Sequence, residues 1–162
     1  MTLLELALTH QGKQYLEGWQ DCFTAIKDVY QEYAELTLTD YSRPHLWFMN
    51  PQLNLLEEHY QEQGFDDVGD NPNAIKVGDL LLMRMGRTNT HNHLAVYVGG
   101  NRIYHHLTDL KSVVCEYDHK WRTRVSKVLR HPQVTKKIEN QPLPTINKVP
   151  YGVRVKLSGG AS

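Results

Sequence analysis

The sequence predicts an α+β domain in which N-terminal helices pack on a central antiparallel β-sheet. Segments with helical spacing of apolar residues occupy positions 3–64. Short apolar runs typical of strands follow between residues 78 and 130, and Gly99-Gly100 provides hairpin-turn chemistry between two of them. Helices first and strands afterwards indicate an α+β domain rather than alternating βα units.

Two helices are predicted before residue 35. Leu4, Ala7, Leu8 and Gln11 keep helical spacing, and Gly12 is a natural stop. Asp21 is a suitable N-cap for a helix over residues 22–34. Cys22 therefore falls in the first turn of that helix.

A third helix and a series of strands complete the predicted domain. The helix is expected to open at Asn50-Pro51, where a cap residue precedes proline, and to end at Gly64. Five strands are expected after it, at residues 80–83, 93–98, 102–107, 113–117 and 127–129.

The chain is predicted to consist of a domain over residues 1–131 and an extended basic arm over residues 132–162. Its length of 162 residues suits one domain with an appendage. Residues 131–162 contain five basic residues and one acid, a local charge of +4, so the rest of this neutral chain carries −4. Several prolines in the arm favour an extended conformation.

A candidate strand lies within the arm. Residues 153–157 alternate with period two, and the domain offers no obvious sheet to receive them. They could add to the sheet edge of a neighbouring protein. An edge strand of the same domain or an unstructured tail explains the pattern equally well.

Composition argues against several classes of protein. The net charge is zero, so no global field attracts the chain to nucleic acid. No apolar run approaches the ~20 residues of a membrane span, and the N-terminus lacks the basic region of a signal peptide. Two cysteines are too few for a disulfide framework. We therefore expect a protein that is made in a cytoplasm and reaches any exterior site by another route.

Cys22 is the candidate nucleophile. A helix N-terminus places about half a positive charge beside the thiol, which favours the thiolate near neutral pH. Backbone amides at residues 20–22 lie where a developing oxyanion could be held. His93 opens one predicted strand and His105 closes the next, so a base and an orienting residue could join the thiol. The alternative is a buried core cysteine, because Cys22 also heads an apolar stripe.

A longer set of residues recurs in a fixed order along the chain. Its members are Tyr15, Gly18, Asp21-Cys22, Gly78-Asp79, the run from His93 to Gly99, His105 and the segment from Val128 to Pro132. This order resembles the NlpC/P60 family of cysteine peptidases over roughly residues 3–131, and more narrowly its phage tail-tip branch. The resemblance depends on the Cys/His spacing, since each shorter piece is common by itself.

The resemblance implies a papain-like fold and hydrolysis of amide bonds in peptidoglycan stem peptides, with no metal or other cofactor. Cys22 would be the nucleophile, His93 the base and His105 the residue that orients His93. Tyr15 would steady the oxyanion or the substrate, and the backbone at Asp21 would lie beside the same carbonyl.

Two features depart from the family pattern. Phe23 follows the cysteine where many cell-wall members carry serine, and the loop before Asp21 is short. Trp19, three residues before Cys22, is the best candidate among the aromatic residues for lining a substrate groove. Packing in the core or at its rim is the alternative for this ring.

The remaining histidines allow a different interpretation. His91 with His93, and the doublet His105-His106, could ligate zinc together with a cysteine. The doublet alternates across a strand, so its rings point to opposite faces, which disfavours a shared metal site. If His105 pointed away from the site, His106 would become the third residue. His91 is expected to be solvated, and Cys115 to be a packed structural thiol.

The leading functional hypothesis is a phage tail-tip cysteine hydrolase that cuts peptidoglycan during cell-wall penetration or acts in tail assembly. Such a protein would enter the virion in the host cytoplasm and act at the bacterial cell wall. Its partners would be the stem-peptide substrate and other tail-tip or hub proteins, the latter through residues 132–162. The alternatives are a non-catalytic tail hub, plug or assembly factor that retains the fold, and a related acyltransferase or amidase.

Overall fold

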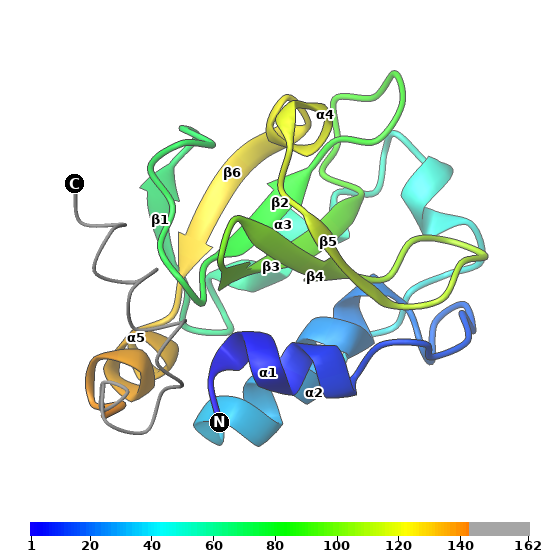
Figure 1. Cartoon of the computed structure of the whole chain (residues 1–162). Coiled ribbons are helices and arrows are strands. Elements are labelled where there is room, and N and C mark those ends of the chain that lie inside the picture. The colour runs from blue at the N-terminus through cyan, green and yellow to red at the C-terminus, as the bar shows by residue number, and fades with distance from the viewer. Residues whose placement is uncertain (143–162) are drawn as a thin grey trace.

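An antiparallel sheet with helices on its faces and edges forms the protein, which confirms the predicted α+β class. The computed structural model describes residues 1–142. Its elements are α1 (Leu3–Thr9), α2 (Cys22–Ala34), the 3-10 helix η1 (Trp47–Met49), α3 (Leu55–Tyr60), β1 (Asp66–Gly69), β2 (Leu80–Met83), β3 (His93–Gly99), β4 (Arg102–His105), β5 (Val113–Glu116), α4 (His119–Arg122), β6 (Val125–Arg130) and α5 (Pro132–Glu139). The six strands lie in the order β1-β6-β2-β3-β4-β5, and each neighbouring pair is antiparallel (Figure 1).

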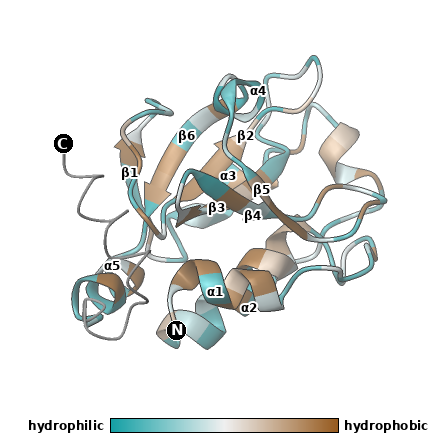
Figure 2. Cartoon of the chain, in the orientation of Figure 1, coloured by the Kyte–Doolittle hydropathy of each residue, from teal (hydrophilic) through white to brown (hydrophobic). Residues whose placement is uncertain are grey.

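The centre of the sheet is buried on both faces. All four residues of β2 are buried, and alternate side chains point to opposite sides. Leu80 and Leu82 join the larger core beneath α1 and α2, whereas Leu81 and Met83 join a smaller core that Trp121 of α4 closes. Figure 2 shows the hydrophobic stretches along the central strands and in α2.

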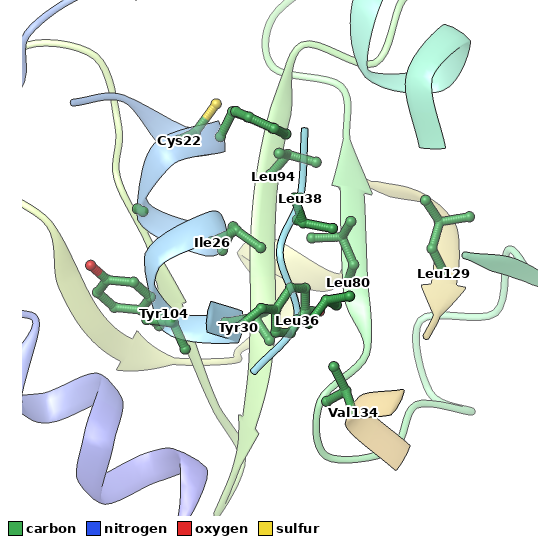
Figure 3. Close-up of a cluster of buried hydrophobic side chains, with 14 of the residues drawn as sticks. Cys22, Ile26, Tyr30, Leu36, Leu38, Leu80, Leu94, Tyr104, Leu129 and Val134 are labelled. Atoms are coloured by element: carbon green, nitrogen blue, oxygen red, sulfur yellow. The ribbon is translucent and has the colours of Figure 1, made fainter. Parts of the chain in front are cut away.

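The predicted helix over residues 22–34 is confirmed, with its predicted cap. The side chain of Asp21 accepts the N–H of Thr24 at 3.1 Å, and the helix ends at Glu35, which has a left-handed φ of 54°. In Figure 3, Cys22, Ile26 and Tyr30 form a row along the side of α2 that faces the sheet. Cys22 is thereby held at the end of a rigid, buried helix.

The third helix is shorter than predicted. It was expected to open at Pro51, but α3 begins at Leu55. Asn50 instead ends η1, and its side chain accepts the N–H of Gln52 at 3.0 Å. This local bond stabilises a turn in competition with a helix start. The sequence analysis also missed β1, whose residues are all exposed, and the single turn of α4.

The C-terminal arm begins with a helix, which corrects the extended conformation predicted from residue 132. His131 caps α5, and Pro132 occupies its first turn, where proline is tolerated because no intrahelical N–H is needed. Within residues 1–142, no helix combines the length and apolar character that crossing a bilayer requires.

The helix α5 is part of the packed domain. Val134 is 1% exposed and lies against Gly78, in the turn that leads into β2. Gln133 donates from its side chain to the carbonyl of Ala34, the last residue of α2, at 2.9 Å. The candidate strand at residues 153–157 lies outside the described part of the chain.

Candidate active site

Cys22 is the first residue of α2 and lies against the start of β3. Its side chain is 5% exposed, and Asp21 before it is the N-cap. The backbone amide of Leu94 is close enough to the thiol to lower its pKa. Because Leu94 follows His93, the fold brings the predicted nucleophile beside the predicted base, although 71 positions separate them in sequence.

The two predicted histidines contact each other directly. Nε2 of His93 lies 2.9 Å from Nδ1 of His105 in a buried hydrogen bond. The β3–β4 register places Ala95 opposite His105, so His93 and His105 share one sheet face. The edge of the His105 ring packs against Trp121, with centroids 4.6 Å apart. His105 is therefore bonded to Nε2 of His93, which leaves Nδ1 as the other ring nitrogen of His93.

No hydrogen bond joins the Cys22 thiol to the His93 imidazole within residues 1–142. The ring of His93 bonds instead to that of His105. The histidine pair is therefore formed in the structure, whereas the thiol is not joined to it.

The protonation states differ from those predicted. Burial raises the pKa of the Cys22 thiol to about 12, and the charge of Asp21 adds to the rise, whereas Leu94 and Arg43 lower it by less. Burial also holds the pKa of His93 well below 6.5. The predicted thiolate near neutral pH is therefore wrong for the resting state. Desolvation outweighs the half charge of the helix terminus, and the site holds a neutral thiol and a neutral imidazole.

Arg43 is a site residue that the sequence analysis missed. Its Nε donates to Oδ2 of Asp21 at 2.5 Å, and both side chains are almost completely buried. It also donates to the carbonyl of Gly18 at 3.0 Å and to Oδ1 of Asp40 at 2.8 Å. Arg43 thereby ties the loop before the nucleophile to the segment after α2. The one available signal was that a buried N-cap aspartate requires a positive partner.

Tyr15 lies beside the site, as predicted. Its ring packs against that of His106, with centroids 5.5 Å apart. Burial raises the pKa of Tyr15 to about 12, a hydrogen bond with Thr108 opposes the rise, and the charge of Cys22 contributes to it. The hydroxyl therefore remains a proton donor near the thiol across the physiological range.

Trp19 lies at the rim of the site and not in the core. Its side chain is 83% exposed, at the tip of a turn closed by hydrogen bonds between Leu16 and Gln20. Trp19 and Glu17 line a surface hollow that also reaches Arg43. This position leaves the ring free to contact a bound molecule.

A groove lies beside His93. It has a volume of about 540 Å³, and its walls include Met49, Arg87, His93, Thr108 and Leu110. Both apolar and hydrogen-bonding side chains are present, so the groove could hold a short peptide next to the base.

The other histidines lie apart from the pair. Nε2 of His106 is 2.9 Å from the carbonyl of Leu110, so it donates that proton. His91 is 3% exposed, with Nδ1 2.9 Å from a carboxylate oxygen of Glu57, so the prediction that it is solvated is wrong. Within residues 1–142, no group of three or more His, Cys, Asp or Glu side chains comes together in a way that could hold a metal ion.

Comparison with known sequences identifies a family that matches most of this chain. The NlpC/P60 family matches residues 9–130. The tail tip assembly protein K of Escherichia phage lambda is 31% identical over 120 residues, which cover 74% of this chain and 58% of that protein. The protein of the same name from Escherichia phage N15 is 25% identical over 123 residues, covering 75% and 49%. The chain therefore spans about half the length of these relatives.

Solved structures share the fold. The NlpC/p60 domain of the peptidoglycan hydrolase SagA superimposes with a TM-score of 0.53 at 18% identity, over 80% of this chain and 96% of that domain. A lipoprotein-like NLP/P60 family protein from Staphylococcus aureus subsp. aureus Mu50 gives a TM-score of 0.51 at 21% identity, over 80% and 40%.

Proposed function

This chain belongs to the NlpC/P60 family, and on that premise we propose that it is a cysteine endopeptidase that hydrolyses amide bonds in peptidoglycan stem peptides. The observation that carries the proposal is the buried 2.9 Å bond between His93 and His105, at the start of the strand whose Leu94 amide lowers the pKa of the Cys22 thiol. A buried imidazole oriented by a second imidazole next to a helix-terminal thiol is the arrangement that acyl transfer requires.

The proposed reaction begins from the neutral pair. When substrate binds, the thiol turns toward Nδ1 of His93, which takes its proton as sulfur attacks the scissile carbonyl carbon. The carbonyl oxygen gains the negative charge, and backbone N–H groups at the start of α2 together with the Tyr15 hydroxyl donate to it.

The reaction then resolves in two further steps. The imidazolium of His93 gives its proton to the leaving amine as the C–N bond breaks, and an acyl-enzyme remains on Cys22. Water enters, loses a proton to His93 and attacks the thioester carbon. The C–S bond breaks, the acid product leaves and the thiolate recovers the proton, so no metal or redox partner is consumed.

The names of two relatives, which are tail tip assembly proteins, support a place of action at a phage tail. We infer that this chain is carried at a phage tail tip, joined to other tail proteins, and cuts the cell wall locally during entry. We propose that residues 132–162 contact those proteins. The helix α5, at the start of this segment, also packs against the domain.

A non-catalytic role in tail assembly is the second candidate. Two observations favour it: the raised pKa of the buried Cys22 thiol, and the lack of a Cys22–His93 hydrogen bond within residues 1–142. In that case the chain would be a hub, plug or assembly factor that keeps the family fold.

Digestion of purified Gram-negative sacculi separates the two roles. Full-chain wild type, Cys22→Ala and His93→Ala would be incubated with sacculi, and the released fragments identified by mass spectrometry. His119→Ala is the matched control, because His119 is an exposed histidine outside the site. New stem-peptide fragments from wild type and His119→Ala alone support the endopeptidase. If wild type releases none, the assembly role is the remaining one.

A further inference from the structure

The hydrogen-bonded chain at the site continues beyond His105. Nε2 of His105 lies 3.4 Å from the sulfur of Cys115 on β5, within hydrogen-bond distance for a thiol. Cys115 is paired with Ile103 of β4, two residues before His105, so the strand register itself brings the sulfur to the ring. The sequence predicted only a packed structural thiol here.

The two histidines can form this chain with either of two proton arrangements. A neutral imidazole has one donor nitrogen and one acceptor nitrogen. If His105 donates from Nε2 to sulfur, its Nδ1 must accept from Nε2 of His93, and Nδ1 of His93 is left unprotonated. If the Cys115 thiol donates instead, both rings reverse and Nδ1 of His93 carries the proton.

Only the first arrangement makes His93 a base on the side left for Cys22. Its Nε2 is committed to His105 at 2.9 Å. The direction of the hydrogen bond between His105 and Cys115 therefore decides whether Nδ1 of His93 can take the proton of the Cys22 thiol.

We propose that Cys115 is a positioning residue whose sulfur accepts the Nε2 proton of His105 and so fixes the tautomers of both histidines. The geometry favours this direction because Cys115 is only half-buried and lines an open surface hollow with Asn101 and Arg102. Its S–H can point to water there, while a sulfur lone pair faces the ring. The edge contact with Trp121 keeps the His105 ring in place, with centroids 4.6 Å apart.

The tautomers can be measured without any enzymatic activity. Full-chain protein labelled with ¹⁵N-histidine would be studied by long-range ¹H–¹⁵N correlation at about pH 8, where imidazoles are neutral. Spectra of His93→Gln and His105→Gln assign the two rings. Wild type is expected to carry the proton on Nε2 in both His93 and His105. A proton on Nδ1 of either ring in wild type would overturn the proposal.

Substitutions at position 115 test whether the sulfur is the cause. Cys115→Ala is expected to give mixed tautomers at His105 and His93, and Cys115→Ser to restore the wild-type pattern, since a hydroxyl oxygen also accepts. Val113→Ala is the matched control, because Val113 lies directly opposite His105 in the same strand pair. A wild-type spectrum for Cys115→Ala would show that the sulfur does not set the tautomer.

The role of Cys115 in catalysis rests on the proposed endopeptidase. The loss of one weak hydrogen bond predicts a roughly two- to tenfold slower release of stem-peptide fragments by Cys115→Ala, with KM unchanged and with recovery in Cys115→Ser. If the spectra behave as expected but wild type releases no fragments, the proposed function fails and the positioning role stands. If wild type is active and Cys115→Ala is equally fast, the catalytic part of the inference is wrong.

Discussion

Arg43 neutralises Asp21 directly behind the candidate nucleophile. The guanidinium Nε and the carboxylate Oδ2 are 2.5 Å apart, and the two side chains are 0% and 1% exposed. Asp21 also caps α2 through the N–H of Thr24. The ion pair therefore stabilises the helix end and fixes the loop around it at the same time.

Replacing Arg43 is expected to destabilise the protein strongly. Arg43→Met leaves a buried carboxylate without a partner, and breaking a buried pair in this way costs about 3–5 kcal/mol. Urea unfolding monitored by circular dichroism measures the loss. Lys27→Met is the control, because Lys27 pairs with the exposed Asp40 at 3.5 Å and such surface pairs contribute about 0–1 kcal/mol. Equal losses in the two variants would contradict the assigned burial of the Arg43 pair.

The contact between α5 and Gly78 predicts a second difference in stability. Gly78 has a φ of +92°, and a Cβ there would lie 2.7 Å from side-chain atoms of both Val134 and Ile138. Gly12 has a similar φ of +85° with nothing within 4 Å. Both Gly→Ala changes incur backbone strain of about 1–2 kcal/mol, and only Gly78→Ala adds overpacking of about 1–3 kcal/mol.

Thermal unfolding of the two alanine variants separates strain from packing. Gly78→Ala is expected to melt clearly below Gly12→Ala. Similar melting temperatures would mean that α5 moves away from β2 at little cost, and the helix would then be part of the arm after all.

The site was largely predictable where it depends on local patterns. A cap residue before an apolar stripe located Cys22, and a glycine turn between two strand patterns brought His93 and His105 to one face. The alternation of strand residues also showed that His105 and His106 could not both join the site. The positions of these residues follow from helix and strand periodicity, whereas their proposed roles depend on the resemblance to the NlpC/P60 family.

The remaining features depend on segments that are distant in sequence. Arg43 lies in irregular chain, where no periodicity indicates burial. The raised pKa of Cys22 results from desolvation by the whole domain, which the helix-terminus argument does not include. The helix α5 was predicted to be part of an extended arm because its one buried residue, Val134, forms no apolar stripe. The burial of Val134 depends on its contact with Gly78, which is distant in sequence.

Cys115 is predicted to react with alkylating reagents before Cys22, although Cys22 is the proposed nucleophile. Burial raises the pKa of Cys22 to about 12, whereas Cys115 is half-buried and its pKa is raised less strongly. Since the thiolate is the reactive form, iodoacetamide near neutral pH should modify Cys115 first, and Cys22 should react mainly at alkaline pH. Peptide mass spectrometry at timed intervals measures both rates. Faster labelling of Cys22 at neutral pH would contradict the resting state described above.

His105 predicts how stability changes in acid. Burial, with smaller effects from His106 and Lys120, lowers its pKa from 6.5 to about 4. The unfolded chain therefore binds more protons than the folded protein between these values, so stability is complete above pH 6.5 and falls as the pH approaches 4. The difference corresponds to about 3 kcal/mol.

Urea unfolding from neutral to acidic pH tests this assignment. His105→Gln should be less stable at neutral pH but should lose less further stability in acid, because glutamine does not titrate. The pH dependence of stability that remains in His105→Gln comes from other groups, including His93, whose pKa is also lowered by burial. The exposed His119 provides the control, and His119→Gln should keep the wild-type slope. If His105→Gln retains that slope as well, His105 is not the buried neutral imidazole on which the orientation of His93 depends.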